Sequence, residues 1–165
     1  MIGLYMITGF LGAGKTTLVN HFLAAHPASR VGVVVNEFGQ ENIDAELIRQ
    51  DTDITINEIN NGSIFCCCRM ADFQEALVRL SALNLDTVVV EASGLADPSN
   101  LKDIFDALNR ETGGIYAYRG GYCLVDATHF IRMYGAIPVM ERQVACSNCV
   151  IINKCDLAHG ETLQK

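Results

Sequence analysis

The sequence predicts an α/β fold of three layers, in which a mostly parallel sheet lies between two layers of helices. Short, β-rich apolar segments alternate along the chain with segments of helical periodicity. Residues 31–35 are a nearly continuous run of valines, which is typical of a strand covered on both faces. Apolar residues at positions 73, 76, 77, 80 and 83 follow the spacing of a helix. Strands that are joined by helices pair in parallel through right-handed crossovers.

The same patterns place the individual elements. Strands are expected at Gly3–Thr8, Val31–Val35, Ile54–Ile59, Val88–Val90, Tyr122–Val125 and Val150–Ile152. Helices are expected at Lys15–Ala25, Ala71–Leu83, Leu101–Leu108 and Pro138–Ala145. The Gly- and Tyr-rich stretch Gly113–Gly121 is predicted to be a mobile loop. With 165 residues, 50% of them hydrophobic, the chain can bury one core, and we expect a single domain over residues 1–165.

Composition and charge exclude several classes of protein. The net charge is −7, and the 12 Lys and Arg residues are scattered, so no nucleic-acid partner is expected. No run of apolar residues is long enough to cross a membrane, and the N-terminus lacks the features of a signal peptide. We therefore expect a cytoplasmic protein without a membrane partner. In that reducing compartment, seven cysteines favour metal ligation, redox chemistry or core thiols over a disulfide framework.

Residues 9–16, GFLGAGKT, match the phosphate-loop pattern G-x-x-x-x-G-K-[ST] between a predicted strand and a predicted helix. This motif predicts the fold of a P-loop nucleoside triphosphatase. Glycines let consecutive backbone N–H groups form an anion-binding nest at the N-terminus of the helix. Lys15 is expected to reach the β- and γ-phosphates, and the Thr16 hydroxyl to bind Mg²⁺. A Gly-rich turn with a chance lysine is the alternative. The residues expected to hold the nucleotide here are Gly9, Gly12, Ala13, Gly14, Lys15, Thr16 and Thr17.

Residues 153–156, NKCD, follow an apolar strand and match the N-K-x-D pattern of guanine recognition. A carboxylate at Asp156 can accept hydrogen bonds from the ring N–H and the exocyclic amine of guanine, and adenine offers neither donor there. Asn153 is expected to brace the loop, and Lys154 to pack over the base. The segment lies at the carboxyl end of a strand, where ligands bind in open α/β sheets. GTP and GDP are therefore the expected ligands, and an ordinary polar turn is the alternative.

Two acidic residues follow predicted strands in positions that suit phosphate chemistry. Glu91 ends an apolar strand, and Gly94 lies three residues later. This spacing suits a carboxylate near Mg²⁺ or the attacking water and a glycine N–H near the γ-phosphate. Glu37 follows another strand and could sense Mg²⁺ or the γ-phosphate from a mobile loop. We therefore expect Lys15, Glu91 and Glu37 to be catalytic, with a capped strand end at Glu91 and a solvated Glu37 as the alternatives.

Three consecutive cysteines, Cys66, Cys67 and Cys68, form a candidate site for a transition metal. In an extended segment Cys66 and Cys68 share one side, and Cys67 becomes a third ligand only if the chain turns. Thiolates suit Zn²⁺ and other soft ions, and two or three of them leave a tetrahedral site open for transfer. Arg69 could lower the thiol pKa. Buried thiols or an incidental reactive cluster are the alternatives.

The other cysteines are expected to be structural. Cys146 and Cys149 form a C-x-x-C pair that could be half a zinc site or a redox pair. We favour a simpler interpretation, in which Cys149 starts a buried strand and Cys146 packs on a helix face. Cys123 is expected in the core, and Cys155 at a tolerant loop position.

Together these residues resemble the G3E family of P-loop GTPases, in particular its CobW-like metallochaperone branch. The resemblance rests on TGFLGAGKTT at 8–17, VVVNEFG at 33–39 with Asp44, Asn61-Gly62, EASGLADP at 91–98, Val125-Asp126-Ala127, and NKCDL at 153–157. The family's usual metal motif, G-C-x-C-C, would place thiols at positions 63, 65 and 66, where this chain has Ser63, Phe65 and Cys66. The family also has a further C-terminal domain, so we expect these residues to be its N-terminal GTPase part, with the last element cut short.

The resemblance implies slow GTP hydrolysis coupled to delivery of zinc or cobalt, through the cysteine cluster, to a metal-requiring client protein. In this hypothesis Mg-GTP orders the Glu37 loop and the cysteine segment, and hydrolysis loosens the metal site. One alternative is a small-molecule kinase or ATPase on the same fold, which would not prefer GTP to ATP. Another is a non-enzymatic switch whose thiols sense metals or oxidants, with negligible hydrolysis.

Overall fold

Six parallel strands form one sheet in the computed structural model, which describes residues 1–35, 54–58 and 70–158. Each neighbouring pair of strands is parallel, and the order across the sheet is β3-β2-β4-β1-β5-β6. The sequence-predicted parallel sheet is therefore confirmed. The strands are β1 (Ile2–Gly9), β2 (Val31–Val35), β3 (Ile54–Glu58), β4 (Thr87–Glu91), β5 (Tyr116–Asp126) and β6 (Cys149–Asn153).

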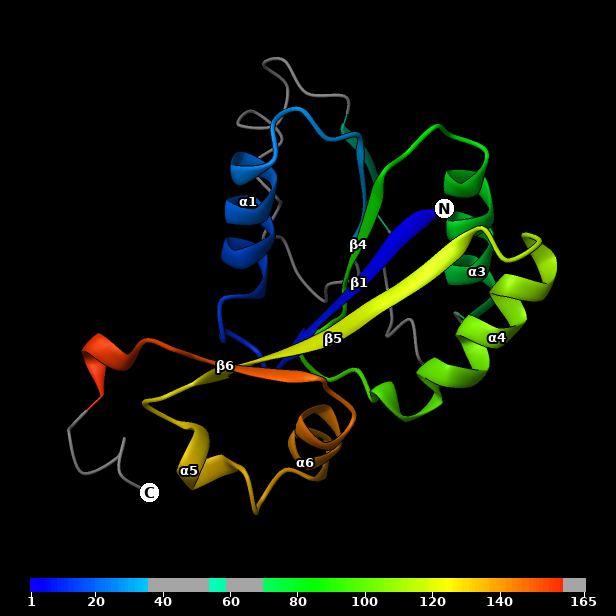
Figure 1. Ribbon diagram of the computed structural model, residues 1–165. Helices are drawn as coiled ribbons and strands as arrows, with labels where there is room; N and C mark the ends of the chain where they lie inside the picture. Colours follow the sequence, from blue (N-terminus) through cyan, green and yellow to red (C-terminus); the bar gives the residue numbers. More distant parts are fainter. Residues whose placement is uncertain (36–53, 59–69, 159–165) are drawn as a thin grey trace.

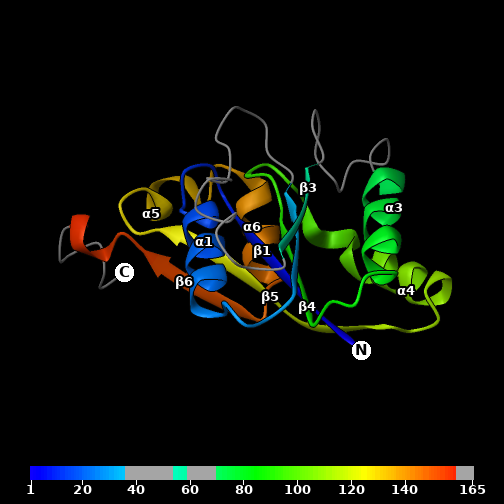
Figure 2. The same cartoon turned by 90° about the horizontal axis from the view of Figure 1, so that it is seen from above.

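Helices cover both faces of this sheet (Figures 1 and 2). One face carries α1, and the other carries α3, α4 and α6, so the three-layer architecture is also confirmed. Two single 3-10 turns, Pro98–Asn100 and Cys155–Leu157, follow β4 and β6. The helices are α1 (Lys15–Ala25), α3 (Met70–Ser81), α4 (Leu101–Glu111), α5 (Phe130–Met133) and α6 (Pro138–Ala145).

The two cores are separated by the alternation of side chains along the strands. In β1, Leu4 and Met6 face the layer of α3 and α4, whereas Ile7 faces α1. Successive side chains of a strand point to opposite faces, so a strand covered by helices on both sides must be apolar at almost every position. The valine run of β2 meets this demand, since all five of its residues are buried.

The prediction of a loop at Gly113–Gly121 is wrong for most of that range, because β5 begins at Tyr116. Tyrosines favour strands, and Tyr116 is buried, with its hydroxyl donating to the Leu77 carbonyl oxygen at 2.6 Å. The glycines mark an irregularity inside the strand. The register with β1 skips Arg119, and Gly120 has a φ of 135°.

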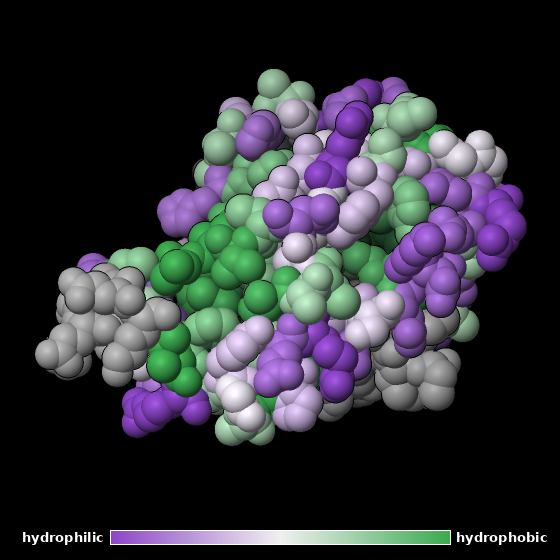
Figure 3. All heavy atoms as spheres, turned by 60° about the horizontal axis from the view of Figure 1, so that its bottom comes forward, coloured by the Kyte–Doolittle hydropathy of each residue, from purple (hydrophilic) through white to green (hydrophobic). Residues whose placement is uncertain are grey.

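The C-terminal strand β6 is more exposed than its apolar sequence predicts. It lies at one end of the described strand order, and Val150 and Ile152 are 42% and 58% exposed. Cys146 and Cys149 are exposed as well, so the expectation of a buried strand start and a packed helix residue is wrong. A strand's neighbours across the sheet decide its burial, and its own sequence does not encode them. Figure 3 turns the lower side of Figure 1 toward the viewer, and this face, which holds β6, α5 and α6, carries a hydrophobic patch.

Within the described part of the chain, no helix is both long enough and apolar enough to cross a membrane.

Candidate nucleotide-binding site

The phosphate loop lies at the carboxyl end of β1, near the centre of the sheet, and leads directly into α1. Gly14 is the residue before the helix and has a φ of 99°, a left-handed conformation that glycine adopts without strain. A side chain at this position would also collide with the Asn153 amide. Gly9 ends β1, Gly12 is exposed and Ala13 is buried. The backbone N–H groups at this helix start therefore have the arrangement that binds phosphate oxygens in proteins.

Lys15 is the cationic group of this loop and is only 4% exposed. Its Nζ donates to the Phe10 carbonyl oxygen across the loop, at 3.3 Å. The ammonium is thus held over the loop by contacts that a phosphate oxygen can replace. Thr17, the last residue of the predicted phosphate-binding stretch, is exposed on the first turn of α1.

Thr16 and Glu91 are brought together by the pairing of β1 with β4. The Thr16 hydroxyl donates to Glu91 Oε1 at 2.7 Å, and the Glu91 carboxyl is fully buried at the end of β4. Hydroxyl and carboxylate oxygens are the protein ligands that Mg²⁺ prefers. Two such oxygens beside an anion-binding loop fit a magnesium ion shared with the phosphates of a nucleotide.

The Glu91 segment, which we define as residues 91–97, packs directly on the phosphate loop. A side-chain carbon at Gly94 would lie 2.6 Å from the Leu11 backbone nitrogen, so only glycine allows this close approach. Ser93 is 2% exposed, and its hydroxyl has no hydrogen-bond partner among the described residues. Buried polar groups are normally hydrogen-bonded. The Glu91 segment therefore presents an unsatisfied hydroxyl one residue from the Gly94 contact with the loop.

The N-K-C-D segment is tied to the phosphate loop by Asn153. Its Nδ2 donates to the Ala13 carbonyl oxygen at 2.9 Å, and its Oδ1 accepts from the Lys154 backbone N–H at 2.9 Å. Lys154 has a φ of 59°, and the short turn after it leaves the Asp156 carboxylate exposed. Although Asn153 and Ala13 lie 140 residues apart, they join the base-recognition and phosphate-binding motifs into one site.

Lys154 also forms an ion pair with Asp126, the last residue of β5, at 2.8 Å. Burial alone would raise the pKa of the Asp126 carboxyl, but hydrogen bonds from Lys154 and from the Thr128 hydroxyl and backbone N–H hold that pKa well below its usual value. The carboxylate is therefore ionised whenever the protein is folded near neutral pH. This ion pair links the strand before α5 to the N-K-C-D segment.

Asp126→Asn is expected to lower the stability of the protein more at pH 5 than at pH 3. The pKa of Asp126 is lower in the folded protein than in the unfolded chain, where it is about 4. The ionised carboxylate therefore adds its full stability above the unfolded-state pKa, and this contribution is lost as the pH falls toward the folded-state pKa. Urea unfolding of the wild type and of Asp126→Asn at the two pH values measures the difference between their free energies of unfolding. Asp106→Asn, on the exposed side of α4, is the control. If the difference in free energy of unfolding is the same at both pH values, the ion pair does not stabilise the fold.

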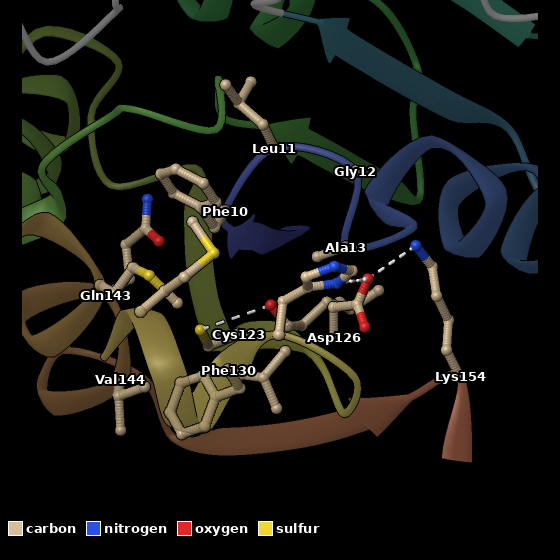
Figure 4. Close-up of a pocket in the computed structure, with 15 residues that line it drawn as sticks. Phe10, Leu11, Gly12, Ala13, Cys123, Asp126, Phe130, Gln143, Val144 and Lys154 are labelled. Atoms are coloured by element: carbon tan, nitrogen blue, oxygen red, sulfur yellow. Dashed lines mark hydrogen bonds and ion pairs between the residues drawn. The ribbon is translucent and has the colours of Figure 1, made fainter. Parts of the chain in front are cut away.

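A mostly apolar cavity of about 340 Å³ lies between the phosphate loop and the α5–α6 part of the chain (Figure 4). In the close-up, Gln143 and Phe10 line one side and Lys154 the opposite side. Leu11 and Phe130 also line the cavity. The phosphate loop and Lys154, both expected to bind the nucleotide, therefore line this cavity.

Four of the sequence-predicted site residues lie outside the described residues, namely Glu37, Cys66, Cys67 and Cys68. Within the part that is described, no group of three or more His, Cys, Asp or Glu side chains is placed to hold a metal ion. Cys123 is buried as expected, and burial raises the pKa of its thiol. Cys155 is exposed at the loop position that the sequence predicts.

Sequence reasoning missed Gln143 of α6, a fully buried polar side chain that contacts the Glu91 segment. It also missed the Asp126–Lys154 ion pair, although the resemblance includes Asp126. A glutamine in an amphipathic helix gives no signal of its burial, since the pattern alone places it as readily on the solvent side. Only the packing of α6 against the turn after β4 reveals its contacts.

A phosphate loop between the central strand and first helix of a parallel sheet, tied to an N-K-C-D segment, defines a P-loop nucleotide-binding domain. The family can be stated more narrowly. The chain belongs to the CobW/HypB/UreG nucleotide-binding domain family, whose model matches residues 3–165.

The chain resembles the zinc chaperone YjiA of Escherichia coli (strain K12), to which it is 32% identical over 163 residues. This match covers 95% of the chain and 50% of YjiA, so the chain spans half the length of that relative. The crystal structure of Zn(II)-bound YjiA GTPase from E. coli has a TM-score of 0.68 at 27% identity and covers 99% of this chain and 52% of that one.

The hydrogenase maturation factor HypB from Archaeoglobus fulgidus has a TM-score of 0.66 at 18% identity. The match covers 99% of this chain and 73% of the HypB chain. At this identity the likeness shows a shared fold alone.

Proposed function

We propose that this chain binds GTP and GDP and slowly hydrolyses GTP, as the nucleotide-binding domain of a metallochaperone. The hydrogen bond from Asn153 to the Ala13 carbonyl oxygen carries this proposal, because it fixes the N-K-C-D segment beside the phosphate loop. The exposed Asp156 carboxylate is then available to the ring N–H and amine of guanine. The name of the E. coli relative's structure, YjiA GTPase, supports the same choice of nucleotide.

In this proposal the chain's own residues bind and orient the phosphates. The backbone N–H groups of residues 12–16 and the Lys15 ammonium hold the phosphate oxygens and stabilise the charge that develops during hydrolysis. Thr16 and Glu91 supply oxygens for Mg²⁺, which neutralises phosphate charge when bound. Glu91 or Glu37 would orient the attacking water, and the Gly94 N–H would donate to the third phosphate.

We further propose that Cys66, Cys67 and Cys68 bind the transition metal that the protein delivers, with zinc or cobalt as the ion. The relative YjiA is named a zinc chaperone, and its structure is described as Zn(II)-bound. Thiolates suit such ions, and an incomplete set of protein ligands favours release to a metal-requiring client protein. The cytoplasm, where thiols stay reduced, suits such a site.

The proposed coupling between nucleotide and metal follows from the topology on either side of the cysteines. The cysteine segment connects β3 to α3, and β3 lies in the same parallel sheet as β1, the strand that leads into the phosphate loop. In a parallel sheet, the segment after β3 starts at the same edge as that loop. We infer that bound Mg-GTP orders the cysteine segment and that hydrolysis weakens its hold on the metal.

Zinc content measured anaerobically on the reduced protein tests the cysteine site. We expect the wild-type protein to retain zinc through desalting, and Cys66→Ser and Cys68→Ser to lose it, because each variant removes a thiolate ligand. Cys149→Ser is the matched control, since it removes an exposed cysteine outside the cluster. Zinc that stays bound in the first two variants but is lost in Cys149→Ser would place the metal elsewhere.

A further inference from the structure

Gln143 is a fully buried polar residue whose side chain reaches from α6 to the Glu91 segment. Its side chain is 1% exposed, and its Nε2 donates to the Gly94 carbonyl oxygen at 3.2 Å and to the Ala96 carbonyl oxygen at 3.0 Å. A glutamine amide carries two N–H donors on its nitrogen, so one side chain can satisfy both carbonyl groups. In Figure 4 the Gln143 side chain rises from α6 on the same side of the cavity as Phe10 of the phosphate loop.

The backbone of α6 at Gln143 is also held in place by hydrogen bonds and an ion pair. The Ser147 hydroxyl donates to the main-chain carbonyl oxygen of Gln143 at 2.7 Å, and it lies 3.4 Å from the Thr8 hydroxyl of β1. One residue earlier on α6, Arg142 forms an ion pair with Asp97 at 2.7 Å. Two neighbouring side chains of α6 therefore hold the Glu91 segment, one through its backbone and one through an acidic side chain.

One of the two residues whose backbone Gln143 holds, Gly94, packs directly against the phosphate loop. Gly94 lies so close to the Leu11 backbone nitrogen that no side chain fits between them. A rotation of the backbone at Gly94 must therefore disturb the phosphate loop, the Gln143 hydrogen bonds or both. A bound diphosphate does not reach the place that a third phosphate occupies, so contacts made by Gly94 distinguish the two nucleotides.

We propose that Gln143 is a positioning residue, which holds the Gly94–Leu95 peptide group by its carbonyl oxygen, keeps the adjoining Gly94 N–H directed at the third phosphate, and so sets the preference of the site for GTP over GDP. This inference rests on the proposed function. Gln143 touches no reacting atom in this account and acts only through Gly94. If its hydrogen bonds are lost, the backbone at Gly94 is held by fewer contacts, and binding of the triphosphate must first fix the orientation of the Gly94 N–H.

The test compares nucleotide affinities of the wild-type protein and Gln143→Met, with a non-hydrolysable GTP analogue and with GDP. Methionine keeps the length and apolar volume of the side chain but has no donor for the two carbonyl groups. We expect analogue affinity to fall about tenfold, the equivalent of one to two hydrogen bonds, with GDP affinity unchanged. Two control variants accompany it. Glu141→Ala changes an exposed residue of α6 and controls for a change in that helix. Leu108→Val changes a buried residue of α4 and controls for a loss of stability.

If Gln143→Met does not fold, Gln143→Asn replaces it, because asparagine keeps the amide but is one methylene too short to reach both carbonyl groups. A loss confined to the GTP analogue supports the inference. An equal loss for both nucleotides, no loss, or a gain for the analogue would overturn it. A wild-type protein that binds neither nucleotide would overturn the proposed function and this inference together, and is recognised before any variant is made.

Discussion

Lys15→Met is expected to lower the rate of GTP hydrolysis by about 100- to 1,000-fold, the loss typical of removing one group that stabilises transition-state charge. Lys15 is the buried cation of the phosphate loop, and its Nζ lies over the loop that receives the phosphates. Methionine preserves most of the side-chain volume while it removes the charge. Phosphate release under single-turnover conditions, with enzyme in excess over GTP, separates the chemical step from binding.

Lys102→Met is the matched control, because Lys102 is an exposed lysine on α4, away from the phosphate loop. Hydrolysis by this variant should equal that of the wild type. A Lys15→Met protein that hydrolyses GTP within a factor of about three of the wild type would exclude phosphate activation by this lysine.

Asp156→Asn is expected to reduce the preference for GTP over ATP by about 10- to 100-fold, because a charge-assisted hydrogen bond contributes about 1.5–3 kcal/mol. The asparagine amide presents N–H donors where the carboxylate presented acceptors. Xanthine carries a carbonyl where guanine carries its amine, so the variant should bind xanthosine triphosphate better than the wild type does. Competition of the three nucleotides against a fluorescent analogue measures the shift.

Asp103→Asn, at another exposed aspartate, controls for the loss of one negative charge. An unchanged ratio of GTP to ATP affinity in Asp156→Asn would contradict guanine recognition by the N-K-C-D segment. That result, together with a wild-type protein that does not prefer GTP, would favour a kinase or ATPase on this fold.

Local sequence patterns predicted those elements whose burial follows from their own sequence. The bounds of α1, β2 and α6 agree with the structure, because the phosphate loop, prolines and a valine run define them. The start of β5 was missed because its tyrosines lie among glycines, and α5 was missed because four residues are too short to show periodicity. The exposure of β6 depends on its place in the strand order, which no local pattern encodes.

The sequence allowed a prediction of which site residues lie together where their motifs directly follow strands. Thr16 and Glu91 lie 75 residues apart, yet both follow from the rule that parallel strands end at one edge. Asn153, which is expected to brace the loop, donates a hydrogen bond to the Ala13 carbonyl oxygen of the phosphate loop. Gln143 could not be found in the same way. Its partners are backbone carbonyl groups, which every residue carries, so only the packed structure identifies them.

The central claim is that the nucleotide state of the phosphate loop controls the affinity of the cysteine segment for metal. Zinc titration of the reduced protein, loaded in parallel with a non-hydrolysable GTP analogue and with GDP, tests this claim most directly. We predict zinc binding that is about tenfold tighter in the analogue state and, by reciprocity, analogue binding that is tighter by the same factor when zinc is bound. Equal zinc affinity in the two nucleotide states would contradict the coupling and leave a guanine-nucleotide hydrolase without a delivery role.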